Sequence, residues 1–353
     1  MGPVTAPTLV ECEDIAWFRD DPALPAAARG AAAALARRIG LDPHRVSEVA
    51  LAVTEASTNL QRHAVDGSLA LRVLRTPGSA AVEFVTVDAG PGIVDVGSAL
   101  SDGISTAGTL GIGLGAVARL ADVFDVHSVP GRGTVVAAQF WPRNRREVRP
   151  PVPPHAVAAG LTRPISGETV CGDSWAVRAD DGRGETGPAL LAILCDGLGH
   201  GPLAARAGEA AMAAFRRSTA TDPEAIMREV HAALRGTRGG AVAVARVEPG
   251  RQRVLLSGVG NVSAFVIGPG VRKSLVSAPG IVGHQMRTLR TFEQPLMPDG
   301  ALVLHSDGLT ERWTPDTMPG LLGHGPTVIA GQLLREAAVR RDDAGIVVVK
   351  GAW

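Results

Sequence analysis

The spacing of apolar residues in the first part of the chain predicts helices that are followed by strands. Apolar residues recur every three or four positions between residues 46 and 60, as they do on the buried side of a helix. Asp42 can cap the first turn with its side chain, and Pro43 suits the first helical position. This helix is therefore predicted to begin there and to reach about residue 63, and an alanine-rich run predicts another helix over 22–39.

Other short apolar runs, bounded by turn-forming residues, predict strands in both halves of the chain. Before residue 143, strands are predicted over 69–74, 81–87, 123–128 and 134–140, and a helix over 114–121. After residue 155, strands are predicted over 189–194, 241–247, 253–257, 263–267, 301–305 and 345–350, and helices over 202–217, 223–234 and 328–340. The mixture of helices and strands places both halves in the α/β class.

A charged and proline-rich segment separates the two halves. Four prolines follow several charged residues within 143–154, and prolines at this density favour an extended, semi-rigid linker. We therefore predict two domains, over 8–142 and 155–353. The length of 353 residues agrees with this division, because a domain commonly has about 150 residues.

The composition narrows the classes of partner and the compartment. The chain has 35 basic and 35 acidic residues, and a balanced charge argues against binding to nucleic acid or to acidic membranes. Its three cysteines show no paired spacing, which suits a reducing compartment. The first residues do not show the basic segment followed by an apolar run that is typical of a signal peptide. We expect a soluble cytoplasmic protein.

A polar stripe on the helix predicted from Asp42 indicates a nucleotide site. Glu55, Asn59 and His63 are four residues apart and share one helix face. Such a stripe is usually a solvated face, but here glycine-rich segments follow it. An asparagine oxygen suits Mg²⁺, which is held by few protein ligands together with phosphates. A nearby carboxylate can act as general base toward an incoming hydroxyl.

Two glycine-rich segments complete the predicted nucleotide site. Asp88 ends a strand and can accept a hydrogen bond from an adenine amino group, while Gly90 and Gly92 allow the backbone to approach the base. A second segment exposes backbone amides and leads into a helix, whose N-terminus favours phosphates. Its glycines are Gly108, Gly111, Gly113 and Gly115.

These motifs resemble the GHKL ATPases, and most closely the small RsbT-type anti-sigma-factor serine kinases. The matching runs are Glu55-Ala-Ser-Thr-Asn59-Leu-Gln-Arg-His63-Ala64, Asp88-Ala-Gly-Pro-Gly-Ile93, Gly111-Ile-Gly-Leu-Gly115 and Gly131-Arg-Gly-Thr134. The resemblance implies that Glu55 is the catalytic base, Asn59 the Mg²⁺ ligand and Asp88 the adenine contact. It also implies that Thr134 backs the adenine pocket, that the motif glycines frame ATP, and that His63 belongs to the same site.

The match to this family has departures. Position 89 is Ala where Asn is common, which removes one polar contact near the nucleotide. The segment between Gly92 and Gly108 is short, as it is in the small kinases. No helical hairpin with a phosphoacceptor histidine precedes the domain, which disfavours a two-component sensor kinase.

Aspartates placed after apolar runs form a second, unrelated pattern. Asp196 and Asp307 are each followed by glycine at the end of a predicted strand, and Asp173 and the pair Asp342-Asp343 add further carboxylates. One Asp-Gly pair is an ordinary turn signal. Several together favour convergence on hard cations, because all-oxygen ligands select Mg²⁺ or Mn²⁺ over zinc. Two such ions can activate a water and neutralise a phosphate ester.

This pattern resembles the PPM/PP2C phosphatases, and best their bacterial SpoIIE/RsbX branch. The matching runs are Gly167-Glu-Thr-Val-Cys-Gly-Asp173, Asp196-Gly-Leu-Gly-His-Gly201, Gly258-Val-Gly-Asn261, Ser306-Asp-Gly-Leu-Thr-Glu311 and Arg341-Asp-Asp343. The resemblance implies metal ligation by Asp173, Asp196, the Gly197 carbonyl, Asp307 and Asp342, with Asp196 and Asp307 central to catalysis. The alternative that Asp343 replaces Asp342 as ligand is left open.

Together the resemblances imply a GHKL α/β sandwich followed by an α/β/β/α PPM sandwich. The leading functional hypothesis is a bifunctional partner-switching regulator that uses ATP, Mg²⁺ and Mn²⁺. Its second domain would dephosphorylate serine or threonine on a STAS-type antagonist, and its first would phosphorylate a STAS partner. In the alternative, the first domain is a nucleotide-gated binding module without kinase turnover. A scaffold with inactive sites is disfavoured by the complete set of carboxylates. Kinases of this type often dimerise, and the sequence leaves the oligomeric state open.

Overall fold

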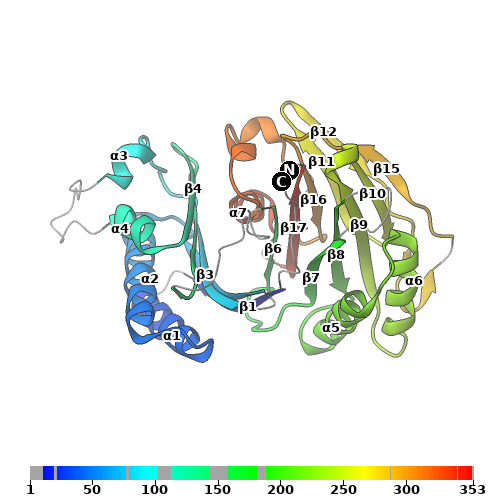
Figure 1. The fold of residues 1–353 in the computed structure, drawn as a ribbon, viewed down its shortest axis with the longest axis horizontal. Helices are drawn as coiled ribbons and strands as arrows, with labels where there is room; N and C mark the ends of the chain where they lie inside the picture. The colour runs from blue at the N-terminus through cyan, green and yellow to red at the C-terminus, as the bar shows by residue number, and fades with distance from the viewer. Residues whose placement is uncertain are drawn as a thin grey trace. The chain divides into compact units, whose positions relative to one another are not determined.

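The protein is described here by a computed structural model that covers residues 11–19, 22–76, 79–101, 113–143, 157–180, 188–286, 288–339 and 341–351. The chain divides into two compact units, over Glu11–Arg149 and Pro150–Trp353 (Figure 1). The division falls within the linker predicted over 143–154, and the bounds of the two domains stay predictions. Within the described residues, no helix is long and apolar enough to cross a membrane.

The N-terminal unit is built on one antiparallel sheet with the strand order β1-β2-β3-β5-β4. Its strands are β1 (Glu11–Arg19), β2 (Ser68–Thr76), β3 (Ser79–Val87), β4 (Val123–Val129) and β5 (Gly133–Phe140). Its helices are α1 (Leu24–Arg38), α2 (Pro43–His63), α3 (Val96–Leu100) and α4 (Gly113–Leu120). Apolar side chains from α1, α2 and α4 pack against one face of the sheet, so this unit is a two-layer α/β sandwich (Figure 1).

Helix α2 begins where the sequence predicts. The Asp42 side chain accepts hydrogen bonds from the backbone N–H groups of His44 and Arg45, both at 3.0 Å. These bonds satisfy two of the amides that a helix start leaves without partners. The helix ends at His63, because Ala64 takes an extended backbone. Glu55, Asn59 and His63 therefore lie on one face of a single continuous helix.

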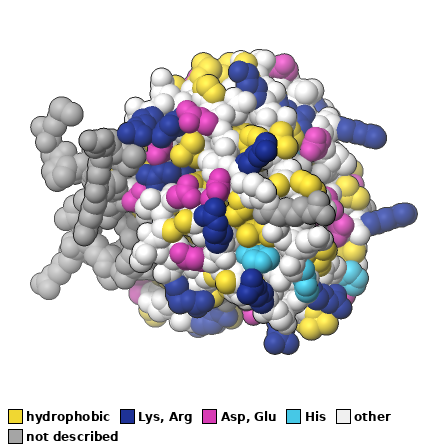
Figure 2. Space-filling view, turned by 90° about the vertical axis from the view of Figure 1, so that its right-hand side faces the viewer, with side chains coloured by type: hydrophobic (Ala, Val, Ile, Leu, Met, Phe, Trp, Pro, Cys, Tyr) yellow, Lys and Arg dark blue, Asp and Glu magenta, His cyan; other side chains and the backbone are white. Residues whose placement is uncertain are grey.

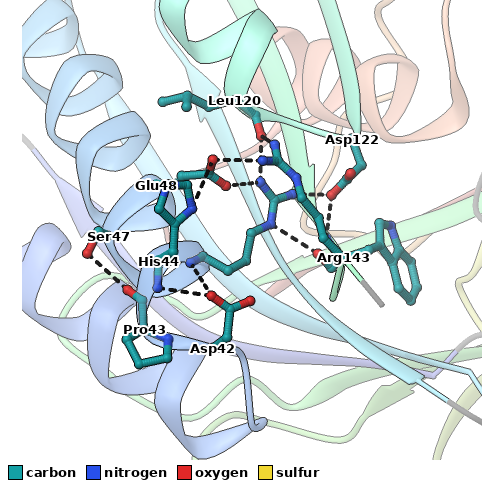
Figure 3. A network of polar contacts seen from close by, with 10 residues as sticks. Asp42, Pro43, His44, Ser47, Glu48, Leu120, Asp122 and Arg143 are labelled. Atoms are coloured by element: carbon teal, nitrogen blue, oxygen red, sulfur yellow. Dashed lines mark hydrogen bonds and ion pairs between the residues drawn. The ribbon is translucent and has the colours of Figure 1, made fainter. Parts of the chain in front are cut away.

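A buried guanidinium ties the start of α2 to distant parts of the same unit (Figure 3). Arg45 is only 1% exposed and pairs with Glu48 at 2.6 Å and with Asp122. It also donates to the carbonyl oxygens of Leu120, at the end of α4, and Trp141, just after β5. A buried charge is tolerated only when it is paired and hydrogen-bonded in this way.

The C-terminal unit contains two five-stranded antiparallel sheets, ordered β15-β10-β9-β8-β7 and β12-β11-β16-β17-β6. The strands of the first sheet are β7 (Asp173–Asp180), β8 (Ala189–Gly197), β9 (Gly240–Glu248), β10 (Arg253–Val259) and β15 (Phe292–Pro295). Those of the second are β6 (Ala158–Arg163), β11 (Ser263–Gly268), β12 (Val271–Leu275), β16 (Ala301–His305) and β17 (Ala344–Lys350). A small hairpin pairs β13 (Gly280–Ile281) with β14 (Gln285–Met286).

The two sheets lie between helices, which gives the four layers of an α/β/β/α sandwich (Figure 1). Side chains from both sheets form one apolar core between them, and a second core lies between the first sheet and its helices. The helices on the first sheet are α5 (Pro202–Arg217) and α6 (Pro223–Leu234), and α7 (Pro326–Ala337) covers the second. The predicted fold class is confirmed for both units.

Several elements differ from the sequence prediction. Helix α7 covers Pro326–Ala337 and not 328–340, because Pro326 occupies its first turn and Ala338 is already extended. Strands β1, β6, β7, β12 and β15 and the short hairpin were not predicted. Many of these lie at sheet edges, where polar residues interrupt the apolar pattern, as the run of exposed positions in β12 shows.

Candidate active sites

Neighbouring strands bring the predicted metal-binding carboxylates together in the C-terminal unit. Asp173 at the start of β7 is directly opposite Asp196 near the end of β8. Asp307 follows β16, and Asp342 lies just before β17, which pairs with β16. Each carboxylate therefore extends from a strand end, and electrostatic effects on their pKa values show that the four groups are neighbours.

Asp173 is the most deeply buried carboxylate of the group, with 4% of its surface exposed. The hydroxyl of Ser306 donates a 2.6 Å hydrogen bond to Asp173 Oδ2. Burial, followed by the charge of Asp196, raises the pKa of Asp173 well above its ordinary value. Burial and the neighbouring carboxylates therefore both oppose the negative charge of Asp173.

Asp196 and Asp307 face each other at the outer side of the group. Burial, followed by the charges of Asp307 and Asp342, raises the pKa of Asp196 to about 7. Asp307 is exposed, yet partial loss of its water shell and the charge of Asp342 raise its pKa as well. The side-chain amide of Asn261 donates to Asp307. Like charges held this close favour either a proton or a bound cation.

The structure distinguishes the two adjacent aspartates before β17. Asp343 is buried, and its carboxylate accepts hydrogen bonds from the backbone N–H groups of Ile165 and Gly172, both at 2.7 Å. Asp342 is exposed, and its charge acts on both Asp196 and Asp307. Asp343 therefore fixes the loop before β7. Among the hydrogen bonds of the described residues, Asp342 accepts only the N–H of Asp343, at 2.9 Å, and its charge acts on the other carboxylates.

Gly197 brings the backbone of β8 close to two other segments. A Cβ atom at Gly197 would lie 2.4 Å from the carbonyl oxygen of Ala204 and 3.0 Å from that of Gly172. Its N–H donates to the same Gly172 carbonyl at 3.3 Å. Only glycine fits this approach, and it keeps the Gly197 carbonyl at the end of the strand beside Asp196.

The donor set fits divalent, oxygen-preferring ions. Within the described residues, no three His, Cys, Asp or Glu side chains form a ready-made cluster that chelates an ion by itself. Mg²⁺ does not require one, because it commonly keeps several waters and uses one or two carboxylates. Asp173 and Asp196 are carboxylates whose raised pKa values a cation would lower, which matches the predicted chemistry.

The predicted nucleotide residues of the N-terminal unit lie on α2 and in the loops that follow β3. Glu55 and Asn59 are partly buried on α2, and His63 is exposed at its last position. Gly90 packs against the end of this helix, since a Cβ atom there would lie 2.7 Å from the His63 carbonyl oxygen. The Asp88 loop therefore contacts the end of the helix face that carries Glu55 and Asn59.

A hairpin holds the Asp88 loop from its other side. The backbone N–H of Asp88 donates to the Thr134 carbonyl oxygen at 3.0 Å. The Thr134 hydroxyl lies 2.9 Å from that of Ser128, which also accepts the N–H of Ile93 at 2.7 Å. Gly92 has φ +70°, and a Cβ atom there would lie 2.4 Å from the Val129 carbonyl oxygen. Asp88 and Thr134, which the sequence predicts to share one site, are thus neighbours.

The second glycine segment is described only in part. Gly113 is the first residue of α4, and nothing lies within 4 Å of the position that its Cβ would take. Gly115 is packed, because its Cβ would lie 2.5 Å from the Leu100 carbonyl oxygen. Gly108 and Gly111 lie outside the described residues.

Sequence reasoning did not assign roles to two groups that shape the carboxylate site, and it left open whether Asp343 is a metal ligand. The two groups are the Ser306 hydroxyl, which binds Asp173, and the Asn261 amide, which binds Asp307. The Asp343 carboxylate instead accepts the backbone N–H of Gly172. Both Ser306 and Asn261 lie within the runs that resemble the phosphatases. Their side chains could have been singled out there because each is polar and lies at the end of an apolar run.

Comparison with protein families and curated relatives gives a separate match for each unit. Residues 18–140 match the family described as Histidine kinase-like ATPase domain, and residues 186–349 match Stage II sporulation protein E (SpoIIE). The serine/threonine-protein kinase RsbT of Bacillus subtilis (strain 168) is 33% identical over 117 residues, which are 33% of this chain and 88% of that protein. The phosphoserine phosphatase RsbX of the same organism is 25% identical over 180 residues, which are 50% of this chain and 85% of that protein.

Solved structures also resemble the chain in part. One described as the bacterial stressosome, a modular system adapted to control secondary messenger signalling, is 30% identical, with a TM-score of 0.47. The match covers 55% of this chain and 98% of the chain in that structure. RsbX in complex with magnesium is 18% identical, with a TM-score of 0.43, and covers 55% of this chain and 94% of its own.

Proposed function

We propose that the chain is a partner-switching regulator. Its N-terminal unit belongs to the RsbT-type histidine kinase-like ATPases, and its C-terminal unit belongs to the SpoIIE-type PP2C phosphatases. In this proposal the C-terminal unit removes phosphate from serine or threonine of a STAS-domain protein. The N-terminal unit binds ATP with Mg²⁺ and phosphorylates a STAS partner. The observation that carries the proposal is the set of carboxylates that paired strands bring together around Asp196.

The proposed hydrolysis assigns each carboxylate a separate task. Bound Mg²⁺ or Mn²⁺ ions would neutralise the phosphate ester and make water a better nucleophile. Asp173, held by Ser306, and Asp196 would hold these ions from the inner side, and the Gly197 carbonyl would add a neutral oxygen. Asp307, oriented by Asn261, and Asp342 would hold them from the outer side. Asp343 keeps the loop before β7 in place.

Metal-dependent hydrolysis of para-nitrophenyl phosphate tests the phosphatase assignment. We expect the wild-type protein to be active with Mn²⁺ or Mg²⁺ and inactive with EDTA, and Asp196→Asn to lose at least 100-fold, about 2.7 kcal/mol of transition-state stabilisation. Asp299→Asn is the matched control, because Asp299 is an exposed aspartate in the turn before β16. Equal activity of the two variants would contradict the assignment.

The proposed kinase activity rests on the arrangement around α2. Glu55 lies one helical turn before Asn59, so a carboxylate and an amide oxygen share the face whose end contacts the Asp88 loop. Asn59 would hold Mg²⁺, Asp88 would accept from the adenine amino group, and Glu55 would take the proton of the attacking serine hydroxyl. Thr134, which bonds to the Asp88 loop, would support the adenine pocket.

A second candidate function for the N-terminal unit is a nucleotide-gated binding module without turnover. The presence of both Glu55 and Asn59, four residues apart on α2, favours the kinase. We expect Glu55→Ala to abolish phosphate transfer while ATP binding persists, because the base does not hold the nucleotide. Transfer at the wild-type rate in that variant would rule out Glu55 as the base.

Labelled phosphate transfer from ATP to STAS-domain proteins of the same genome separates the two candidates. Wild type, Glu55→Ala and Asp196→Asn are compared in Mg²⁺ and in Mn²⁺. Label that persists on a STAS protein only in Asp196→Asn supports a chain that both adds and removes the mark. Absence of label in every variant, combined with dephosphorylation of a phosphorylated STAS protein, supports the binding module.

A further inference from the structure

One arginine lies beside the carboxylate site without an assigned role. Arg238 belongs to the turn between α6 and β9, and its Nη1 atom lies 2.9 Å from the position that a Cβ would take on Gly199. Gly199 is in the loop that directly follows Asp196 and Gly197. The absence of a side chain at Gly199, which has φ +85°, gives the guanidinium space above this loop.

The turn that carries Arg238 is fixed on both sides. The backbone N–H of Leu198 donates to the Gly239 carbonyl oxygen at 3.0 Å, which joins the turn to the loop after Asp196. His284 Nε2 lies 3.1 Å from the carbonyl oxygens of both Thr237 and Arg238. The backbone of the Arg238 turn is therefore fixed in part by the loop that directly follows Asp196.

The Arg238 side chain is not used to stabilise the fold. It is exposed, and within the described part of the chain its guanidinium makes no ion pair or hydrogen bond. Two arginines of the neighbouring strands are paired instead: Arg246 with Asp180 and Glu248, and Arg253 with Glu248 and Glu293. In Figure 2, which faces the right-hand side of Figure 1, basic (Lys or Arg) and histidine side chains lie close to one another in the lower part of the view.

We propose that Arg238 binds the phosphate group of the substrate at the carboxylate site. This inference rests on the proposed phosphatase function. A guanidinium offers paired N–H donors that match phosphate oxygens, and it keeps its charge at every physiological pH. Asp196 and its neighbours bring negative charge to the site, so a phosphate dianion needs positive charge besides the metal ions. Arg238, whose guanidinium lies next to Gly199 in the loop that follows Asp196, would supply this charge.

Apolar side chains beside Arg238 could contact the substrate residues that flank a phosphoserine. Leu198 is 41% exposed and Ile281 is 37% exposed. Both adjoin the Arg238 turn, because Leu198 bonds to Gly239 and the Ile281 Cγ2 lies 2.9 Å from the position of a Cβ on Gly239. The partner that fits this surface is a phosphoserine segment with apolar neighbours.

Steady-state kinetics with para-nitrophenyl phosphate and competition by inorganic phosphate test Arg238 in the full-length protein. We expect Arg238→Ala to raise both KM and the inhibition constant of phosphate about 10-fold, with kcat within about 2-fold. Arg238→Lys should recover part of this loss, because it restores charge without the paired donors. Arg235→Ala is the matched control, since Arg235 is an exposed arginine three residues earlier. If KM and the inhibition constant in Arg238→Ala equal those in Arg235→Ala, the proposal is wrong.

Calorimetric titration of inorganic phosphate into the Mn²⁺-loaded protein separates this inference from the proposed function. If the wild type does not hydrolyse the ester, the phosphatase assignment fails. In that case, weaker phosphate binding by Arg238→Ala than by Arg235→Ala still supports the role of Arg238. If the wild type hydrolyses the ester but the two variants bind phosphate equally, the assignment of Arg238 fails and the phosphatase stands. A wild type that binds no phosphate overturns the inference.

Discussion

Asp196 has a charge that the metal-free protein opposes, and this controls how the protein responds to pH. The pKa of its carboxyl is about 7 in the folded chain and near 3.8 in an unfolded one. Between these values the folded chain binds more protons than the unfolded chain does. The contribution of the Asp196 carboxyl to the free energy of unfolding is therefore complete below about pH 4 and is lost as the pH rises toward 7.

We therefore expect the unfolding temperature of the EDTA-treated protein to fall more steeply between pH 5 and 8 in wild type than in Asp196→Asn. The amide cannot ionise, so it removes this part of the pH dependence. Thermal unfolding followed by circular dichroism measures it, with Asp299→Asn as the control for losing an exposed aspartate. Parallel curves for wild type and Asp196→Asn would show that Asp196 does not carry this effect.

Substitutions of the adjacent residues Asp342 and Asp343 should affect different properties, metal binding in one case and stability in the other. Asp343→Ala leaves the N–H groups of Ile165 and Gly172 without their acceptor, which costs about 1–3 kcal/mol for each unsatisfied group. Asp342→Ala removes an exposed carboxylate, so we expect little change in the free energy of unfolding without metal but weaker Mn²⁺ binding. Denaturant unfolding and metal titration provide the two measurements. A reversed pattern would make Asp343 the ligand.

Residue types and spacing predicted where the carboxylates lie but could not distinguish their tasks. Asp196 and Asp307 stand out because each follows an apolar run and precedes glycine. The difference between Asp342 and Asp343 depends on which carboxylate turns inward to the backbone of residues 165 and 172, and that contact spans more than 170 positions in the sequence. The role of Arg238 depends in the same way on a turn meeting a distant loop.

At the scale of whole elements, Arg45 joins α2 to α4 and to the end of β5. Arg45→Ala would leave Glu48 and Asp122 without their buried partner, so we expect a loss of about 3–5 kcal/mol in the free energy of unfolding. Arg143 is 46% exposed on its side chain and also pairs with Glu48, so Arg143→Ala should cost about 1 kcal/mol or less. Chemical denaturation measures both, and equal losses would show that burial of Arg45 does not dominate.

Most helices were predictable because their ends carry local signals. α2 has Asp42 as its cap, and α5 and α6 each have proline in the first turn, so the predicted and observed starts coincide. The edge strands lack such signals. β12 has the sequence Val-Arg-Lys-Ser-Leu with mostly exposed positions, and its pairing with β11 supplies the stability that its own pattern does not show. β6 is largely alanine and glycine and is a strand because it pairs with β17.

At the scale of the whole molecule, two compact units with separate cores should respond to separate ligands. We expect calorimetry to resolve two unfolding transitions, one raised by ATP with Mg²⁺ and one by Mn²⁺. A ligand at a hundred times its dissociation constant adds about 2.7 kcal/mol to the unit that binds it. Arg45→Ala identifies the N-terminal transition, because it should lower that one alone. A single transition that both ligands raise equally would show that the units unfold together.

The Arg45 network also has a consequence for the order in which the protein is synthesised. Arg45 and Glu48 leave the ribosome early, but their bonds to Trp141 and Arg143 join groups 96 and 95 positions apart. The complete set of partners of Arg45 is therefore available only after residue 141 has been synthesised. A gene truncated after residue 140, where the family match ends, would encode every strand of this sheet and still leave Arg45 without the Trp141 carbonyl and Glu48 without Arg143.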